Sequence, residues 1–275
     1  MGTDKRARQK EQGRTRAEQA RKAAESAARH RRLVNVGVGP LVLALLVVGI
    51  TLLTGNDEDS TASTRSTTTQ QTDTTESTPV PTTQKAVAPT CPPATGAAAR
   101  ATAFTKAPDM CIDPAKHYEA VVDTSDGQFT ITLDPAKAPR TVNNFVFLAR
   151  YHFYDGTIFH RIIKDFMIQG GDPLGTGMGG PGYEFDDELP KKGDYQHYSI
   201  AMANSGPDTQ GSQFFIVTGS QGTSLPPQYT LFGKVTAGTD TIDKIAATPV
   251  KTGESGEESS PTKKVTITGV TITES

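Results

Sequence analysis

The chain has 275 residues, of which 35% are hydrophobic and none is Trp, and its formal net charge is −2. Aliphatic and aromatic side chains gather within residues 117–273, which is enough for one hydrophobic core. Eleven Lys and Arg residues lie within the first 32 positions against four acidic ones, so the remainder is acidic. An acidic folded part without a basic patch argues against nucleic acid as a partner.

Residues 1–32 form a basic segment, and residues 33–53 follow as twenty-one positions without a charge. At a rise of about 1.5 Å per residue, such a run is long enough to cross a bilayer as a helix. Basic residues before the run and acidic residues after it predict an N-terminus in the cytoplasm. We therefore expect a single-pass protein of the cytoplasmic membrane with an uncleaved transmembrane helix and an extracytoplasmic folded part.

Residues 54–110 lead from this span to the folded part. Within residues 54–90, seventeen of thirty-seven residues are Ser or Thr and none is aromatic, which predicts a disordered linker. Cys91 and Cys111 are the only cysteines, and both fall on the side of the membrane where thiols oxidise. We expect a disulfide between them, with two free thiols as the alternative. No CxxC motif or histidine pairing indicates a metal, and we predict no cofactor.

The folded part is predicted over residues 111–275 and is rich in strands. Residues 117–123 and 127–133 flank a turn and are typical of a β-hairpin. A helix is predicted from Pro139, where apolar residues recur at helical spacing, and a second one over residues 239–247. Further strands are expected at residues 157–163, 166–169, 198–203, 213–218, 229–235 and 264–273. Many strands with two helices indicate a mainly β fold, and we expect a closed antiparallel barrel.

Residues 159–172, FHRIIKDFMIQGGD, place one Arg, one His and one Gln among apolar side chains. Side chains alternate along an extended backbone, so Arg161 should share a face with Ile163, and Phe166 should share one with Ile168. The pattern puts a cation beside an apolar surface. Two buried strands with a snorkelling Arg are the purely structural alternative.

Two glycine-containing stretches follow. Residues 175–180 match the GxGxxG pattern of dinucleotide sites, but no helix follows them, so they are interpreted as a surface loop. Residues 201–216, AMANSGPDTQGSQFFI, read as two apolar strands around a loop of small residues that lets another backbone approach closely. A peptide could therefore lie along this loop.

The stretches at 159–172 and 201–216 resemble the two signature segments of the cyclophilins, the peptidyl-prolyl cis-trans isomerases. The sequence LFGKV at 231–235 and a final VTI strand follow in the family's order, and the resemblance spans residues 117–272. Together with the span and the linker, the chain looks like a membrane-anchored bacterial member. The resemblance implies an eight-stranded antiparallel barrel with a helix over each open end.

The resemblance also implies the roles of individual residues. Arg161 matches the catalytic arginine. Matching positions of the apolar proline pocket are Phe166, Met167, Phe215 and Leu225, with Tyr229 at its edge. Matching positions that hold the peptide backbone or orient the arginine are Gln169, Ala203, Asn204 and Gln213. Ser224 stands where many members carry Trp, so weak binding of cyclosporin-type macrocycles is expected.

These residue types suit the reaction. An X-Pro bond rotates over a barrier of about 18–20 kcal/mol because of amide resonance. In the twisted transition state the prolyl nitrogen regains a lone pair, which a guanidinium N–H can bind without covalent chemistry. We expect a monomeric isomerase acting on proline-containing segments of exported or cell-surface proteins. The alternative is a non-catalytic proline-peptide binding module or holdase chaperone.

Overall fold

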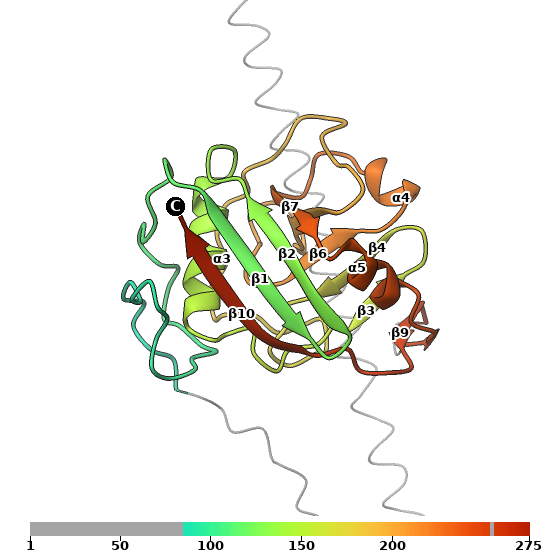
Figure 1. Cartoon of the computed structure of the whole chain (residues 1–275), viewed down its shortest axis with the longest axis horizontal. Coiled ribbons are helices and arrows are strands. Elements are labelled where there is room, and N and C mark those ends of the chain that lie inside the picture. The colour runs from blue at the N-terminus through green and yellow to red at the C-terminus, as the bar shows by residue number, and fades with distance from the viewer. Residues whose placement is uncertain (1–84, 254–255) are drawn as a thin grey trace, which may run out of the picture. The chain divides into compact units, whose positions relative to one another are not determined.

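The computed structural model describes residues 85–253 and 256–275 (Figure 1). The predicted basic segment, the span at 33–53 and residues 54–84 of the linker lie outside this part of the chain. Within the described residues, no helix combines the length and the apolar character needed to cross a membrane.

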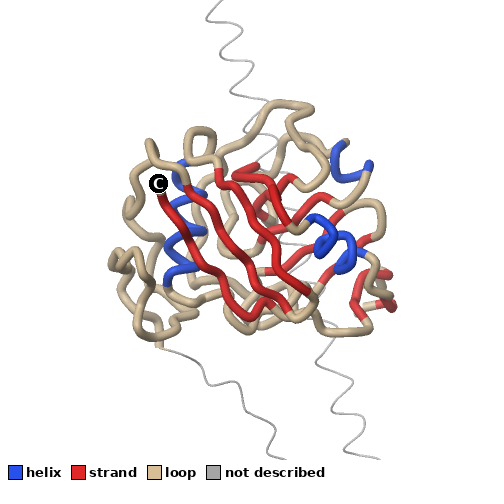
Figure 2. The backbone as a smooth tube through the Cα atoms, in the orientation of Figure 1, coloured by secondary structure: helices blue, strands red, loops and turns tan. Residues whose placement is uncertain are grey.

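One antiparallel sheet of eight strands forms the body of the domain, in the order β10-β1-β2-β7-β5-β6-β4-β3. Figure 2 shows the three long strands of this sheet running side by side with α3 behind them. The strands are β1 (Tyr118–Thr124), β2 (Gly127–Leu133), β3 (Arg161–Ile163), β4 (Met167–Gly170), β5 (Ser199–Met202), β6 (Phe214–Val217), β7 (Leu231–Ala237) and β10 (Ile267–Glu274). Each of them was predicted, to within a few residues except for β3, so the mainly β fold is confirmed.

The sheet does not close into the expected barrel. Its outer strands, β10 and β3, do not pair with each other. The irregular segment before β3 links the two ends of the sheet by isolated bridges from Ile158 to Asp172 and Thr266 and by a few backbone hydrogen bonds to the start of β10. The strand predicted at residues 157–163 forms only over its last three residues, too few to pair along the eight residues of β10. The closed barrel was therefore wrong, and the sheet is a curled half-barrel.

Both predicted helices are present, as α3 (Pro139–Arg150) and α5 (Thr239–Ala246). Helix α3 has no capping side chain of its own; instead the carboxylate of Glu188 accepts the backbone N–H groups of Arg140 and Thr141 at 3.1 and 2.8 Å. Three further elements were not predicted: the short helix α4 (Ser220–Thr223) and a separate hairpin of β8 (Val250–Thr252) and β9 (Glu258–Pro261).

The face of the sheet toward the main core carries a row of isoleucines along β3, β4, β6 and β5. Ile162 pairs with Ile168, Ile168 with Ile216, and Ile216 with Ile200, and none of the four is more than 1% exposed. Because paired residues project to the same face, this isoleucine row faces the main core. Phe166 packs instead with the residues on the other face, so the prediction that it shares a side with Ile168 was wrong; Phe166 precedes β4 and lies in the turn.

Residues 85–110 pack against the domain, which therefore extends N-terminal to the expected start at Cys111. Phe104 is 1% exposed, with its ring centroid 4.8 Å from that of Phe147 and 5.1 Å from that of Tyr151. Its backbone N–H donates to Pro181 O at 2.8 Å. This approach requires glycine at the next position: Gly182 has φ +94°, and a Cβ there would lie 2.7 Å from Phe104 O.

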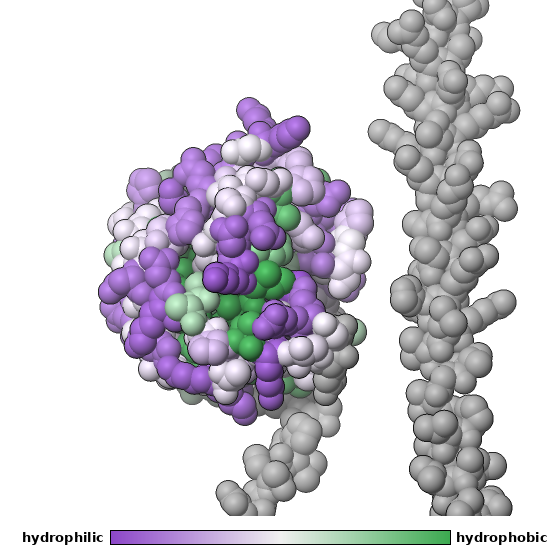
Figure 3. Space-filling model, turned by 90° about the vertical axis from the view of Figure 1, so that its right-hand side faces the viewer, coloured by the Kyte–Doolittle hydropathy of each residue, from purple (hydrophilic) through white to green (hydrophobic). Residues whose placement is uncertain are grey.

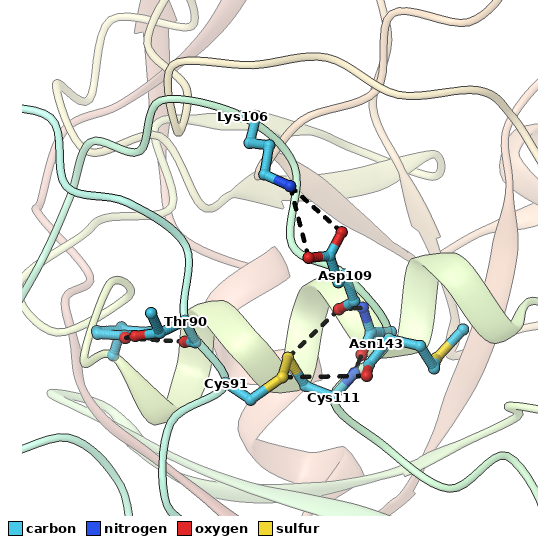
Figure 4. The surroundings of a disulfide bond; sticks show 8 residues. Thr90, Cys91, Lys106, Asp109, Cys111 and Asn143 are labelled. Atoms are coloured by element: carbon cyan, nitrogen blue, oxygen red, sulfur yellow. Dashed lines mark hydrogen bonds and ion pairs between the residues drawn. A yellow bond between two sulfur atoms is a disulfide. The ribbon is translucent and has the colours of Figure 1, made fainter.

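A disulfide joins Cys91 to Cys111 and fastens this N-terminal segment (Figure 4). Asn143 of α3 holds the same place: its side-chain oxygen accepts the N–H of Cys111 at 2.6 Å, and its amide nitrogen donates to Asp109 O at 3.1 Å. The segment is thereby tied to the helix that fills the core.

Replacing Cys91 and Cys111 together by Ser should lower the free energy of unfolding by about 3 kcal/mol, because the cross-link removes the freedom of a loop of roughly twenty residues from the unfolded chain. Urea unfolding of the full chain measures the change. A reducing agent should destabilise the wild type similarly and leave the double variant unaffected. Equal stability of the oxidised and reduced wild type would contradict the expectation.

Candidate functional site

The outer face of the sheet carries the predicted site residues in one row. Arg161 pairs with Gln169, and Gln169 pairs with Phe215, so their side chains project together, opposite to the isoleucine row. Met167 and Val217 pair two positions along the same strands and therefore lie beside this row. The structure thus brings the predicted cation next to the predicted pocket.

An apolar cluster occupies this outer face. It contains every predicted pocket residue and Ala203, and Figure 3 shows an apolar surface ringed by polar side chains on this side of the domain. Met167 and Phe215 are buried at its base, and the ring of Tyr229 stands at 89° to that of Phe215 with 5.4 Å between centroids. The members are Ile163, Phe166, Met167, Tyr195, Ala201, Ala203, Phe215, Val217, Leu225, Tyr229 and Leu231.

A chain of hydrogen bonds runs from Arg161 across the site. Arg161 Nη1 donates to Gln169 Oε1 at 3.2 Å, Gln169 Nε2 donates to Gln213 Oε1 at 3.0 Å, and Gln213 Nε2 donates to the carbonyls of Gly177 and Gly179 at 3.0 and 2.9 Å. A guanidinium has only donors, so Gln169 must turn its oxygen toward Arg161, and each following amide is oriented in turn.

The carbonyls at the end of this hydrogen-bond chain belong to the glycine-rich loop at residues 175–180. Asp172 binds the backbone N–H groups of this loop. Its carboxylate accepts the backbone N–H groups of Leu174, Thr176, Gly177 and Gly179 at 2.6–3.1 Å, and Asp172 is 1% exposed. Burial raises the pKa of the Asp172 carboxyl, but the four backbone donors outweigh it and leave that pKa below its ordinary value. The interpretation of residues 175–180 as a loop is confirmed.

A cleft of about 790 Å³ lies between the glycine-rich loop and the segment after β5. Four predicted residues line it: Gln169, Ala203, Asn204 and Gln213. Asn204 Nδ2 donates to Gln228 O at 2.9 Å, and within the described residues neither backbone group of Asn204 has a hydrogen-bond partner. A free N–H and a free C=O can pair with the backbone of a bound peptide.

Two polar residues that hold predicted site residues in place were not themselves predicted. Tyr195 is 2% exposed, and its hydroxyl donates to Tyr229 O at 2.7 Å while accepting the N–H of Tyr229 at 3.1 Å, which fixes the pocket edge. Glu257 pairs with Arg161 in two hydrogen bonds. Neither belongs to a periodic pattern in the sequence. Among the described residues, no three His, Cys, Asp or Glu side chains are grouped to hold a metal ion.

Replacing Asp172 by Asn should lower the free energy of unfolding by about 2 kcal/mol near neutral pH, because an amide group cannot accept all four backbone N–H bonds. The folded-state pKa of Asp172 is depressed, so its contribution is complete above the unfolded-state pKa of about 3.9 and is lost as the pH falls through the folded-state value. Urea unfolding at about pH 6 and about pH 3 should show the difference between wild type and variant shrinking in acid. A difference that is unchanged or grows in acid would contradict this role of Asp172.

A guanidinium at the edge of an apolar pocket, beside a groove with free backbone groups, matches the arrangement that the sequence predicts for a protein of the prolyl-isomerase class. A family model described as cyclophilin type peptidyl-prolyl cis-trans isomerase/CLD matches residues 120–272. The chain belongs to the cyclophilin-type peptidyl-prolyl cis-trans isomerases.

Individual relatives agree with this assignment. Peptidyl-prolyl cis-trans isomerase B of Streptomyces anulatus is 48% identical over 153 residues, covering 49% of this chain and 87% of that protein. A probable peptidyl-prolyl cis-trans isomerase A of Mycobacterium leprae is 41% identical over 169 residues, covering 56% and 91%. The crystal structure of a Cryptosporidium parvum cyclophilin type isomerase is similar with a TM-score of 0.51 and 34% identity, covering 57% of this chain and 98% of that one.

Proposed function

We propose that this cyclophilin-type isomerase acts on X-Pro bonds of exported or cell-surface proteins and that Arg161 is its catalytic residue. The observation that carries the proposal is the row of paired residues on the outer face, which sets the Arg161 guanidinium at the edge of the apolar cluster around Phe215. In this proposal the prolyl ring lies on Met167 and Phe215, and the preceding peptide bond lies at the rim beside Arg161.

The proposed mechanism requires no covalent step. Rotation about the X-Pro bond breaks amide conjugation, and the prolyl nitrogen becomes pyramidal and gains a lone pair that accepts an Arg161 N–H. This hydrogen bond is weak in the planar ground states, whose nitrogen lone pair is delocalised, and strong in the twisted state, so it lowers the barrier. No proton is transferred in this mechanism, so the rate requires no titrating group.

The groove holds the substrate chain while the bond rotates. In this proposal the backbone groups of Asn204, which have no partner among the described residues, bind the peptide backbone. Gln169 and Gln213 line the same cleft. With the ring fixed in the pocket and the chain fixed at Asn204, the carbonyl before proline is the part left free to turn. Positioning of this kind reduces the entropy that must be lost at the transition state.

Replacing Arg161 by Ala should lower kcat/KM on a proline tetrapeptide by roughly two orders of magnitude, because the hydrogen bond specific to the twisted state is lost. Arg161→Lys should be impaired as well, since an ammonium lacks the planar fork. The assay follows cis-to-trans conversion by the full chain.

Lys164→Ala is the matched control, because Lys164 is an exposed cation in the turn that follows β3, and its side chain has no hydrogen bond or ion pair among the described residues. It should keep wild-type activity. Wild-type rates in Arg161→Ala would refute the assigned mechanism.

We further propose that the enzyme is a monomer anchored in the cytoplasmic membrane by residues 33–53, with the catalytic domain outside. The absence of charge over these positions and the basic residues before them support this arrangement. As a flexible coil, residues 54–84 of the linker would span roughly 28–33 Å, which lets the domain reach emerging chains near the membrane surface.

Fractionation of cells expressing the full chain should place it with membranes, resistant to high salt and released by detergent. Protease added outside the cytoplasmic membrane should remove the domain and leave the basic segment protected, because the positive-inside rule sets this orientation. Recovery of the intact chain in the soluble fraction would overturn the proposed anchor without bearing on catalysis.

A further inference from the structure

The β8–β9 hairpin brings a carboxylate to the guanidinium of Arg161. Glu257 Oε2 accepts from Arg161 Nε at 2.7 Å, and Glu257 Oε1 accepts from Arg161 Nη2 at 2.9 Å. Two parallel, charge-assisted bonds of this kind fix the plane of a guanidinium as well as its position. The hairpin lies outside the main sheet, and its strands flank the turn that carries Glu257.

The backbone around Glu257 is itself held. Its carbonyl accepts the N–H groups of Gly253 and Ser259 at 2.8 and 3.0 Å, so the side chain projects from a hydrogen-bonded turn. The hydrogen bonds from Arg161 lower the pKa of the Glu257 carboxyl to about 2 in spite of partial burial, with Ser259 adding a smaller effect. The carboxylate is therefore charged throughout the range in which the enzyme works.

The pairing leaves part of the guanidinium fork available. Of the five N–H donors of arginine, Glu257 takes the one on Nε and one on Nη2, and Gln169 takes one on Nη1. One N–H on Nη1 and one on Nη2 have no acceptor among the described residues. Glu257 thus occupies the Nε edge of the fork and leaves donors at both terminal nitrogens.

We propose that Glu257 is a positioning residue for the isomerase reaction: it holds the Nε edge of Arg161 so that the two remaining N–H groups face the substrate. The inference rests on Arg161 being the catalytic residue. Glu257 and Gln169 fix the fork from two sides, one from the hairpin and one from the sheet. A freely rotating arginine would lose side-chain entropy when it binds the transition state. Glu257 and Gln169 restrict the Arg161 side chain before the substrate binds, so this entropy cost does not add to the barrier.

The same pair sets the charge that a substrate meets. With Glu257 ionised, the guanidinium and the carboxylate together carry no net charge. The charge of Arg161 therefore gives no preference for an acidic or a basic residue next to the proline of the substrate. Removal of the carboxylate leaves a bare cation there. Substrate preference should then shift toward an acidic residue before proline, by about threefold for partly solvated charges several ångströms apart.

The test compares Glu257→Gln, Glu257→Asp and Glu258→Gln in the full chain. Glu257→Gln should lower kcat about fivefold to tenfold with KM changed less than about twofold, because the orientation of Arg161 is lost and the pocket is intact. Glu257→Asp, which keeps a carboxylate, should recover part of that loss. Glu258 is the matched control on the same hairpin, since it is exposed and its side chain has no hydrogen bond or ion pair among the described residues.

Two further readouts separate positioning from a structural role. The ratio of kcat/KM for Glu-Pro and Lys-Pro peptides should rise about threefold in Glu257→Gln and stay constant in Glu258→Gln. The melting temperature should change by less than about 2 °C, since the Arg161 and Glu257 side chains are 36% and 41% exposed and exposed ion pairs contribute little stability.

Combination with Arg161→Ala distinguishes the possible failures. If Arg161→Ala lowers kcat/KM about a hundredfold, and Glu257→Gln lowers kcat in the wild type but adds no further loss to the residual activity of Arg161→Ala, the positioning role stands. If Arg161→Ala shows this loss while Glu257→Gln alone keeps or raises kcat, the positioning role of Glu257 is overturned and the proposed mechanism survives. A raised kcat would identify Glu257 as an inhibitory contact. If Arg161→Ala keeps wild-type activity, both the mechanism and the positioning role are overturned.

Discussion

The pairing register of β3, β4, β6 and β5 is the constraint on which the site depends. It places four isoleucines in one row toward the core and Arg161, Gln169 and Phe215 in the next row on the outer face. Because side chains alternate along a strand, a slip by one residue would bury the guanidinium and expose the isoleucines. The free energy of burying the isoleucine row, about 1.5–3 kcal/mol for each side chain, therefore also determines where the guanidinium lies.

Hydrogen-bond polarity extends this constraint to the groove. Arginine only donates, so the Arg161 contact orients Gln169, Gln169 orients Gln213, and Gln213 reaches the carbonyls of the glycine-rich loop. Asp172 holds the N–H groups of the same loop from the other side. The wall of the cleft and the guanidinium are consequently parts of one network, in which every amide has a single orientation that satisfies its neighbours.

The sequence was informative where the pattern is local. Alternation predicted the β1–β2 hairpin, helical spacing predicted α3, and the resemblance over residues 159–172 and 201–216 selected residues that the structure brings together. Closure of the sheet depends on pairing between its two ends, which local alternation does not encode, and the short β3 leaves it open. Glu257 sits in an acidic, glycine-containing turn without periodicity, so nothing local connects it with Arg161, ninety-six positions earlier.

Partial exposure of the cation reconciles stability with the proposed chemistry. A fully buried Arg–Glu pair would carry a large desolvation cost, whereas side chains that remain 36% and 41% exposed avoid most of it. The orientation of the Arg161 guanidinium then comes from its three hydrogen bonds rather than from burial. The buried apolar part of the site lies around Met167 and Phe215. A prolyl residue suits a site with an apolar base and a charged rim. It has no backbone N–H that would lack a partner on the apolar surface, and its nitrogen has a lone pair for Arg161 only when the X-Pro bond is twisted.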